Sequence, residues 1–319
     1  MDIYRSEAGR AALGTWCADE LDRRLPSADR RLVDSPLGPT HLTTAGPGPQ
    51  ELVLLPGTNM NAATSIPVIR ALAGRFRVTV PDLPGQPGLS TGERPRADLV
   101  GVYRDWLDHV LATVSDGPVL LVGESRGTAV ALCATPRSQV AGLVLAAPAG
   151  LTDARLSPGM LWASLPWLAQ PTPARSARML AVMYGDGVVA DHDHLVEWMT
   201  LAALHTRSSL APPPLPDPVI TRWRTTPCQV LVGEHDRFFT PRRVQPPAAG
   251  LLHASTTIIP RGGHLLSHTN PHAIADAAAW VLDAVQAPGR HDSPVAERCA
   301  RRPGDRAARG ARPEEEHRP

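Results

Sequence analysis

The chain contains no lysine: all 32 of its basic residues are arginine, and they are set against 31 acidic residues. The absence of lysine excludes Schiff-base chemistry at a lysine amine and any nucleotide site that needs a P-loop lysine. The near balance of charge argues against general electrostatic attraction to nucleic acid or to an anionic membrane. We therefore expect neither nucleic acid nor a membrane among the partners of this protein.

Long apolar runs and paired cysteines are also missing. No stretch of about 18 apolar residues predicts a transmembrane helix, and the first residues lack the apolar core of a signal peptide. The cysteines are scattered and form no C-x-x-C pair, which argues against a cysteine metal site. They are Cys17, Cys133, Cys228 and Cys299. We expect free thiols in a reduced, cytoplasmic protein.

With 319 residues, 43% of them hydrophobic, the chain is long enough to bury a sizeable core. Short apolar runs typical of buried strands alternate with helix-length segments. The strand runs are 51–57, 75–85, 117–125, 139–150, 228–236 and 254–264, preceded by a strand pair near 31–34 and 40–44. The helical segments are 5–25, 62–73, 97–114, 126–135, 241–251 and 271–286. This alternation predicts an α/β fold with a mostly parallel, twisted sheet and helices on both faces.

One long interval breaks the alternation. Between Gly150 and Pro227 no good strand occurs, and three Met- and Trp-rich stretches have helical spacing. They lie at about 158–168, 174–184 and 191–205. The simplest interpretation is an all-helical insertion into an α/β core, followed by a disordered tail that lacks apolar periodicity. The predicted units are a core of residues 1–150 and 227–287, an insertion of residues 151–226, and a tail of residues 288–319.

A nucleophile motif follows one of the predicted strands. The pentapeptide Gly123-Glu124-Ser125-Arg126-Gly127 matches G-x-S-x-G, and it lies between the apolar strand PVLLV and the small-residue helix TAVALCA. A nucleophile elbow needs this strand–turn–helix context, because its glycines allow a tight turn that lifts the serine hydroxyl clear of the sheet. The pattern predicts that Ser125 is a catalytic nucleophile.

A serine hydroxyl needs a nearby base, and the base needs a carboxylate that fixes its tautomer. In this type of sheet the acid and then the histidine follow the serine along the chain. Asp236 comes after the strand run CQVLVG, and His264 comes after TTIIP in the segment Arg261-Gly-Gly-His. The order and placement favour Asp236 as the acid and His264 as the base.

Other residues compete for both roles. Glu234 and Asp276 are alternatives for the acid, and His253 and His268 are alternatives for the base. Asp236 is better placed at a strand end than either alternative acid. We expect His253 to begin a strand and His268 to cap a turn, and we interpret both as surface or turn histidines.

An oxyanion hole needs two N–H groups that point at the tetrahedral oxygen. One is expected from the residue after the nucleophile, Arg126, and the other from the loop after the run ELVLLPG, where Thr58 is the best candidate. The side chain of Arg126 could meet an anionic substrate, but we favour a salt bridge.

Five motifs then appear in a familiar order: LLPGTN (54–59), DLPGQPGLS (82–90), GESRG (123–127), GEHDRFF (233–239) and GGH (262–264). In these motifs the chain resembles the α/β-hydrolase superfamily, in its cap-bearing carboxylesterase-like branch, over residues 10–287. The resemblance implies an α/β-hydrolase fold, places Thr58 at the oxyanion donor position, and makes the insertion a helical cap over the active site. Pro56 stands where the family often has His, and Arg126 is unusual after the nucleophile.

Two weaker signals lie in the insertion. The run Asp191-His192-Asp193-His194 could suggest a metal cluster, but its two histidines would not share one helix face, and an acid at a helix start suits the helix dipole. Because a Ser–His–Asp set generates its own nucleophile, we predict no metal and no cofactor. Six large residues could line an apolar pocket or simply pack the insertion: Trp162, Trp167, Met179, Met183, Trp198 and Met199.

The sequence therefore predicts a serine hydrolase that cleaves a carboxylic ester or related acyl bond of a small molecule with an apolar acyl or alcohol group. A C–C bond hydrolase, a lyase and a cofactor-free perhydrolase are alternatives on the same triad, and a non-catalytic ligand-binding homologue is an alternative of another class. A serine in place of an aspartate nucleophile argues against the epoxide hydrolase and haloalkane dehalogenase branches. Neither the oligomeric state nor the natural substrate follows from the sequence.

Overall fold

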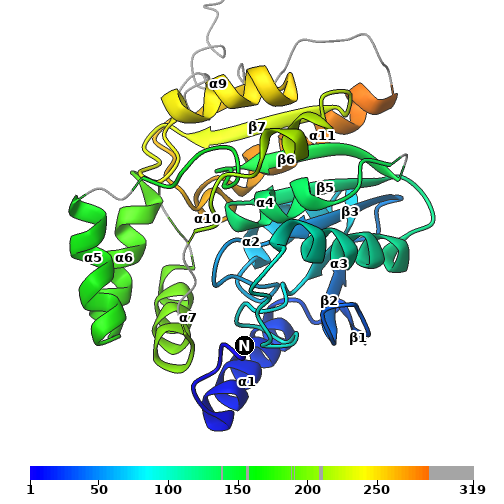
Figure 1. Ribbon diagram of the computed structural model, residues 1–319. Helices are drawn as coiled ribbons and strands as arrows, with labels where there is room; N and C mark the ends of the chain where they lie inside the picture. Colours follow the sequence, from blue (N-terminus) through cyan, green and yellow to red (C-terminus); the bar gives the residue numbers. More distant parts are fainter. Residues whose placement is uncertain (138, 156–157, 188, 190, 208–210, 287–319) are drawn as a thin grey trace, which may run out of the picture.

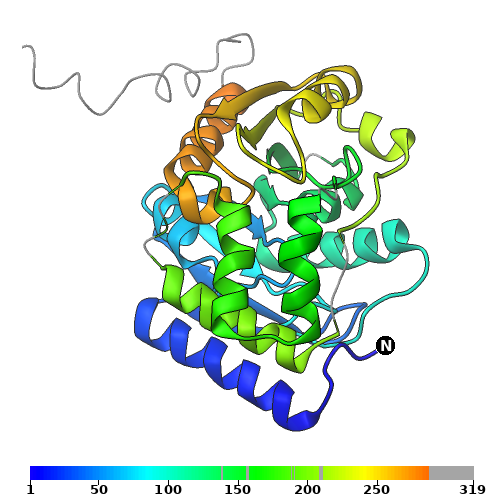
Figure 2. The same ribbon diagram turned by 90° about the vertical axis from the view of Figure 1, so that its left-hand side faces the viewer.

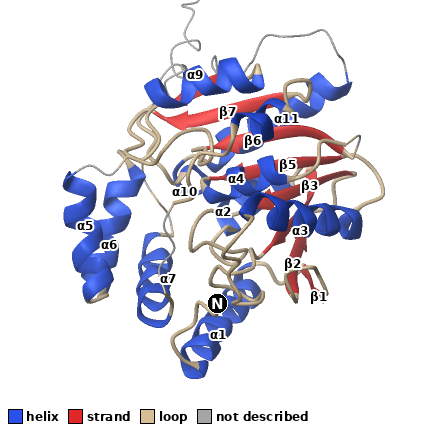
Figure 3. Cartoon of the chain, viewed as in Figure 1, coloured by secondary structure: helices blue, strands red, loops and turns tan. Residues whose placement is uncertain are grey.

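A single mixed sheet forms the centre of the computed structural model, which describes residues 1–137, 139–155, 158–187, 189, 191–207 and 211–286. Within these residues eight strands lie in the order β1-β2-β4-β3-β5-β6-β7-β8 (Figures 1 and 3). Their bounds are β1 Asp29–Val33, β2 Thr40–Ala45, β3 Gln50–Leu55, β4 Phe76–Pro81, β5 Val119–Glu124, β6 Val140–Ala146, β7 Cys228–Gly233 and β8 Ser255–Ile259. Strand β2 runs antiparallel to both β1 and β4, and every other neighbouring pair is parallel. The predicted α/β fold with a mostly parallel sheet is confirmed.

Helices cover both faces of this sheet. Successive strand residues point to opposite sides, so the apolar strands present an apolar surface on each face. Along β5, Leu120 and Val122 join one apolar cluster, whereas Val119 and Leu121 join the other. The first cluster includes residues of α2 (Ile66–Ala73), α10 (Leu266–Thr269) and α11 (Pro271–Gln286). The second includes residues of α3 (Leu99–Val114), α4 (Arg126–Cys133), α8 (Asp217–Thr221) and α9 (Pro241–Leu252). Burial of both faces explains why the central strands are continuous apolar runs.

The interval between β6 and β7 is helical, with α5 (Pro158–Ala169), α6 (Pro173–Tyr184), α7 (His192–His205) and then α8. Helices α5 to α7 stand together to one side of the sheet in Figure 1, and in Figure 2 they lie in front of the rest of the molecule, on the side that faces the viewer. The N-terminal helix α1 (Glu7–Arg24) packs against α7, and the rings of Trp16 and Trp198 lie 4.8 Å apart. The first helix of the chain therefore supports the insertion as well as the core.

Three local expectations differ from the structure. The short helices α8 and α10 were not expected from the apolar pattern, because each is only about one turn long. His253 does not begin a strand but ends α9 in a left-handed conformation. Asp191 is the N-cap residue of α7, but its carboxylate forms an ion pair with Arg24 and makes no capping hydrogen bond to the helix.

Other expectations concern the periphery of the chain. The predicted tail, residues 288–319, lies outside the described residues. None of the helices in the described part of the chain is long and apolar enough to cross a membrane. The cysteines that the structure describes, Cys17, Cys133 and Cys228, are free thiols in the interior.

Candidate active site

Ser125 lies in a sharp turn between the end of β5 and the start of α4. Its backbone has φ 51° and ψ −116°, a conformation that non-glycine residues rarely adopt. The N–H of Ser125 donates to the carbonyl of Ala146 at 2.9 Å, and its own carbonyl accepts from the N–H of Thr128 at 3.0 Å. These bonds hold the turn that the G-x-S-x-G pattern predicts.

The two glycines of the pentapeptide allow close backbone packing. A Cβ on Gly127 would lie 1.9 Å from the carbonyl oxygen of Leu55, so α4 can start against the end of β3 only without a side chain there. A Cβ on Gly123 would lie 2.7 Å from backbone atoms of Gly127 and Thr128. The motif thus brings the turn next to the loop that follows β3.

Ser125, His264 and Asp236 form a continuous hydrogen-bonded chain. The Ser125 hydroxyl lies 3.0 Å from Nε2 of His264, and Nδ1 of His264 lies 2.9 Å from Oδ2 of Asp236. The other carboxylate oxygen of Asp236 accepts the N–H groups of Phe238 at 2.8 Å and Phe239 at 3.0 Å. Because a carboxylate only accepts, Nδ1 of His264 carries the hydrogen and Nε2 of the neutral ring is free to accept from Ser125.

The environment of His264 favours its protonated form. Burial lowers the pKa of this ring, but the charge of Asp236, its hydrogen bond and the charge of Glu124 outweigh burial and raise the pKa above its ordinary value of 6.5. Asp236 and His264 are 2% and 5% exposed, so water screens their attraction weakly. The rings of Phe238 and Phe239 flank the imidazole, with centroids 4.6 and 5.6 Å from its own.

The alternative residues lie elsewhere. Glu234 is exposed and accepts the N–H of Arg261 at 2.9 Å, and Asp276 lies within α11. His253 is exposed at the end of α9. The interpretation of His268 as a surface or turn histidine is wrong: it lies in α10 with only 6% of its surface exposed.

The loop after β3 brings the two expected oxyanion donors together. Nε of Arg126 donates to the hydroxyl of Thr58 at 3.2 Å, and a Cβ on Gly57 would lie 3.5 Å from the Cβ of Ser125. Thr58 and Arg126 therefore flank the nucleophile from two different elements. Arg126 is 8% exposed, and its Nε contacts the Thr58 hydroxyl. The salt bridge that we favoured for its side chain stays a prediction.

Several residues that hold this loop escaped the sequence analysis. The side chain of Gln86 accepts the N–H of Asn59 at 3.0 Å, and the indole N–H of Trp198 donates to the carbonyl of Asn59 at 2.7 Å. Asp82 accepts the N–H groups of Ala62 at 2.9 Å and Leu89 at 2.7 Å. Gln86 and Asp82 belong to the DLPGQPGLS motif, which was the one available signal for them.

An apolar pocket of about 340 Å³ lies beside the nucleophile turn. Its walls come from the start of α3, from α4 and from residues 212–216, and they include Leu99, Tyr103, Val130 and Leu215 together with Arg126. Of the large insertion residues, Trp167, Met179, Trp198 and Met199 belong to the apolar core cluster, Met183 packs against it, and Trp162 is 68% exposed. All of these side chains except Trp162 therefore pack against the core, and none of the six is among the residues that line this pocket.

The Asp-His-Asp-His run is spread over separate contacts. Asp191 pairs with Arg24, His192 lies 3.3 Å from the hydroxyl of Tyr184, and His194 lies 3.4 Å from Glu20. In the part of the chain that the structure describes, no three His, Cys, Asp or Glu side chains gather as a metal ion would require.

The amino-acid sequence also matches a known protein family. The sequence profile described as the Alpha/beta hydrolase family matches residues 52–277. The protein belongs to this family. A search of the curated proteins finds no match.

Solved structures share the same architecture. Naproxen esterase (carboxylesterase NP) from Bacillus subtilis is 18% identical, with 85% of this chain and 98% of that chain covered at a TM-score of 0.69. Carboxylesterase CesB from Bacillus subtilis is 18% identical, with 89% and 100% covered at a TM-score of 0.67. The 2-hydroxy-6-oxo-6-phenylhexa-2,4-dienoate hydrolase of Rhodococcus sp. strain RHA1 is 19% identical, with 81% and 100% covered at a TM-score of 0.63. At such identities the likeness concerns the fold.

Proposed function

We propose that the protein is a serine hydrolase that cleaves a carboxylic ester or a related acyl bond, with Ser125 as nucleophile, His264 as base and Asp236 as the orienting acid. The observation that carries this proposal is the continuous hydrogen-bonded chain from the Ser125 hydroxyl through His264 to Asp236. Its support is that the three groups are buried, hydrogen-bonded in the required order, and placed at the carboxyl ends of parallel strands.

The chemistry follows from these positions. His264 takes the proton of Ser125 as the serine oxygen bonds to the carbonyl carbon, and the negative oxygen is held by the N–H groups of Thr58 and Arg126. His264 then passes the proton to the leaving alcohol, which departs and leaves an acyl-enzyme. Water, deprotonated by His264, attacks the acyl carbon, releases the acid and restores the Ser125 hydroxyl.

The substrate we propose is a small molecule with an apolar acyl or alcohol group. The pocket of about 340 Å³ beside Arg126 supports this class, because its walls are largely apolar. We propose that the helical insertion, residues 151–226, acts as a cap over the site. Its contact from Trp198 to the carbonyl of Asn59 supports this role.

A fluorophosphonate probe tests the proposal directly, because it reacts only with an activated serine. Wild type should be labelled and should hydrolyse p-nitrophenyl acetate and hexanoate, whereas folded Ser125→Ala should do neither. Ser255→Ala, at the opposite end of the parallel strands, is the matched control and should keep both activities. Absence of labelling in folded wild type would contradict the proposal and favour a binding function.

The ester assignment has a separate test. A C–C bond hydrolase, a lyase or a perhydrolase would use the same three residues, so labelling alone does not distinguish them. Comparison of kcat/KM for p-nitrophenyl esters with that for a vinylogous 1,5-diketone separates the ester and C–C reactions. We expect the esters to be preferred.

A further inference from the structure

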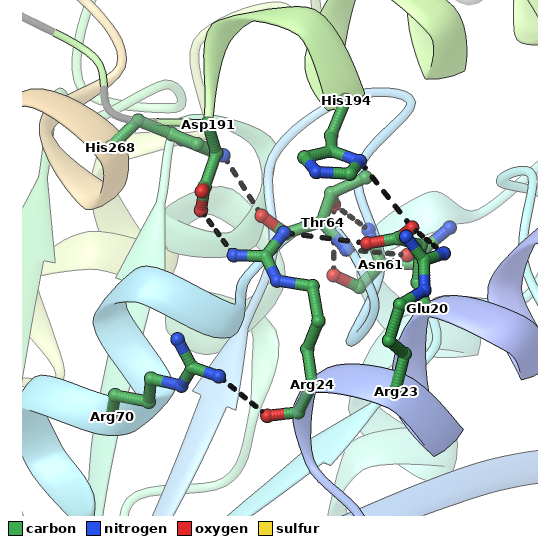
Figure 4. A network of polar contacts seen from close by, with 9 residues as sticks. All are labelled: Glu20, Arg23, Arg24, Asn61, Thr64, Arg70, Asp191, His194 and His268. Atoms are coloured by element: carbon green, nitrogen blue, oxygen red, sulfur yellow. Dashed lines mark hydrogen bonds and ion pairs between the residues drawn. The ribbon is translucent and has the colours of Figure 1, made fainter.

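A second buried chain of polar groups starts at Glu124, the residue before the nucleophile, and is not used by the proposed triad. Glu124 is 4% exposed, and its Oε1 accepts the N–H of Ser267 at 2.8 Å. Its Oε2 lies 2.5 Å from the hydroxyl of Ser267, which in turn lies 2.9 Å from Nδ1 of His268. Nε2 of His268 lies 2.8 Å from the carbonyl oxygen of Thr64 (Figure 4).

The partners at the two ends of this chain restrict where its hydrogens can lie. The carbonyl of Thr64 only accepts, so Nε2 of His268 carries a hydrogen. If Nδ1 carries none, it must accept the single hydroxyl hydrogen of Ser267, and the short contact to Glu124 then needs a hydrogen from the carboxyl. If Nδ1 does carry one, it donates to Ser267, and Ser267 donates to an ionised Glu124. In either arrangement both contacts of the Ser267 hydroxyl are hydrogen bonds.

Burial makes each of these hydrogen bonds costly to lose. Glu124, Ser267 and His268 are all less than 9% exposed, so an unmatched donor or acceptor among them would lack water as a substitute. Burial lowers the pKa of His268 below its ordinary value, and the charge of Arg24 adds to this effect. The charges of Glu124 and Asp191 and the hydrogen bond to Thr64 raise the pKa but do not outweigh burial. Asp191 and Arg24 form an ion pair with each other beside the ring (Figure 4).

The far end of the chain reaches the loop after β3. Oδ1 of Asn61 accepts the N–H of Thr64 at 3.0 Å, and the hydroxyl of Thr64 accepts the N–H of Asn61 at 2.9 Å (Figure 4). These bonds fix the carbonyl to which His268 donates. The loop is the one that carries Thr58, so the chain joins the nucleophile turn, the histidine loop and the expected oxyanion loop.

The near end of the chain constrains His264. His264 and Ser267 are three residues apart, and the N–H of His264 donates to the carbonyl of Met183 at 2.6 Å. The backbone of His264 is therefore tied to the insertion on one side and, through Ser267, to Glu124 on the other. Glu124 directly precedes Ser125 in the chain, as Ser267 closely follows His264. The hydrogen bond between Ser267 and Glu124 therefore connects the same two segments as the 3.0 Å contact between Ser125 and His264.

We propose that Glu124, Ser267 and His268 form a hydrogen-bonded chain that positions His264 against Ser125, with Glu124 as a positioning residue. The inference rests on the proposed serine-hydrolase function. It has a specific consequence: a glutamine at position 124 can replace the carboxyl. Its Oε1 can accept the N–H of Ser267, its amide can donate to the Ser267 hydroxyl, and that hydroxyl can donate to a neutral His268.

The experiment compares Glu124→Gln, Glu124→Ala and Ser267→Ala with wild type at alkaline pH, where His264 is neutral in every protein. Glu124→Gln should keep kcat for p-nitrophenyl acetate within about threefold, because all the hydrogen bonds of the chain survive. Glu124→Ala and Ser267→Ala should lower kcat by about 10- to 100-fold with little change in KM, because His264 loses its alignment. Glu197→Ala, at an exposed acid of α7, is the matched control.

Two results would overturn the proposal. A loss in Glu124→Gln as large as in Glu124→Ala would mean that the negative charge, and not the hydrogen-bonded chain, is what matters. Wild-type kcat in both alanine variants would mean that the chain does not position His264. Fluorophosphonate labelling distinguishes these two results from failure of the proposed serine-hydrolase function. If the protein is not a serine hydrolase, wild type itself is not labelled. If Glu124→Ala does not fold, Ser267→Ala, which removes one oxygen, gives the same comparison.

Discussion

Replacement of Asp236 by asparagine is the sharpest test of how the site sets the tautomer of His264. The oxygen of the new side chain can still accept the N–H groups of Phe238 and Phe239, so the turn after β7 should keep its shape. That orientation places the amide NH₂ opposite Nδ1 of His264, at the present 2.9 Å position of Oδ2. Two donors cannot face each other there, so Nδ1 must become the acceptor and Nε2 must carry the hydrogen.

With a hydrogen on Nε2, His264 cannot take the proton of Ser125. The same change of tautomer in a serine protease lowers kcat about 10⁴-fold. We expect kcat/KM of Asp236→Asn to fall about 10³- to 10⁴-fold, which corresponds to about 4 to 5.5 kcal/mol of transition-state stabilisation.

The assay is hydrolysis of p-nitrophenyl acetate, with the melting temperature measured on the same samples. Glu234→Gln is the matched control, because Glu234 is an exposed acid on the same edge of the sheet and should change kcat/KM less than about twofold. A loss below about tenfold in a folded Asp236→Asn would refute the reasoning, since the tautomer would then not depend on this carboxylate.

Three further predictions follow from the geometry. Because the pKa of His264 is raised above 6.5 and the base acts only when neutral, kcat/KM should rise with pH through a midpoint above 6.5; a midpoint below 6.5 would contradict the raised pKa. Gly127→Ala should lower the free energy of unfolding in urea by about 3 kcal/mol, because its Cβ would lie 1.9 Å from the carbonyl oxygen of Leu55. A change under about 1 kcal/mol would contradict this packing. Val130 lines the apolar pocket beside Arg126, so Val130→Phe should raise KM for p-nitrophenyl hexanoate about tenfold and leave KM for p-nitrophenyl acetate unchanged. Leu32→Phe, on exposed β1, is the control. Equal effects on both esters would show that acyl chains do not enter this pocket.

Much of the core could be predicted because its strands are buried on both faces. Continuous apolar runs such as Val119–Val122 have no simpler explanation than a covered parallel strand, and the turn residues at their ends identify the functional edge. The three triad candidates could be singled out for the same reason, since each follows such a run. The pattern also indicated α5, α6 and α7 of the insertion to within one residue at each end, but it missed α8.

What escaped prediction depends on partners distant in the sequence. His268 has the same local context as a surface turn residue, and only its contacts with Glu124 and Thr64 through a folded sheet make it a buried residue. The Nε of Arg126 donates to the hydroxyl of Thr58, 68 positions earlier. Spacing along the chain indicates which side chains point into the core, but it does not identify which polar groups meet there.

The backbone of Ser125 has a consequence for engineering. Its φ of 51° is unfavourable for every residue with a Cβ, at a cost of roughly 1 to 3 kcal/mol, and only glycine avoids that cost. Ser125→Gly should therefore be inactive and yet more stable than Ser125→Ala. A library selected only for heat resistance would enrich glycine at the position that we propose for the nucleophile, so selection schemes for this scaffold must include turnover.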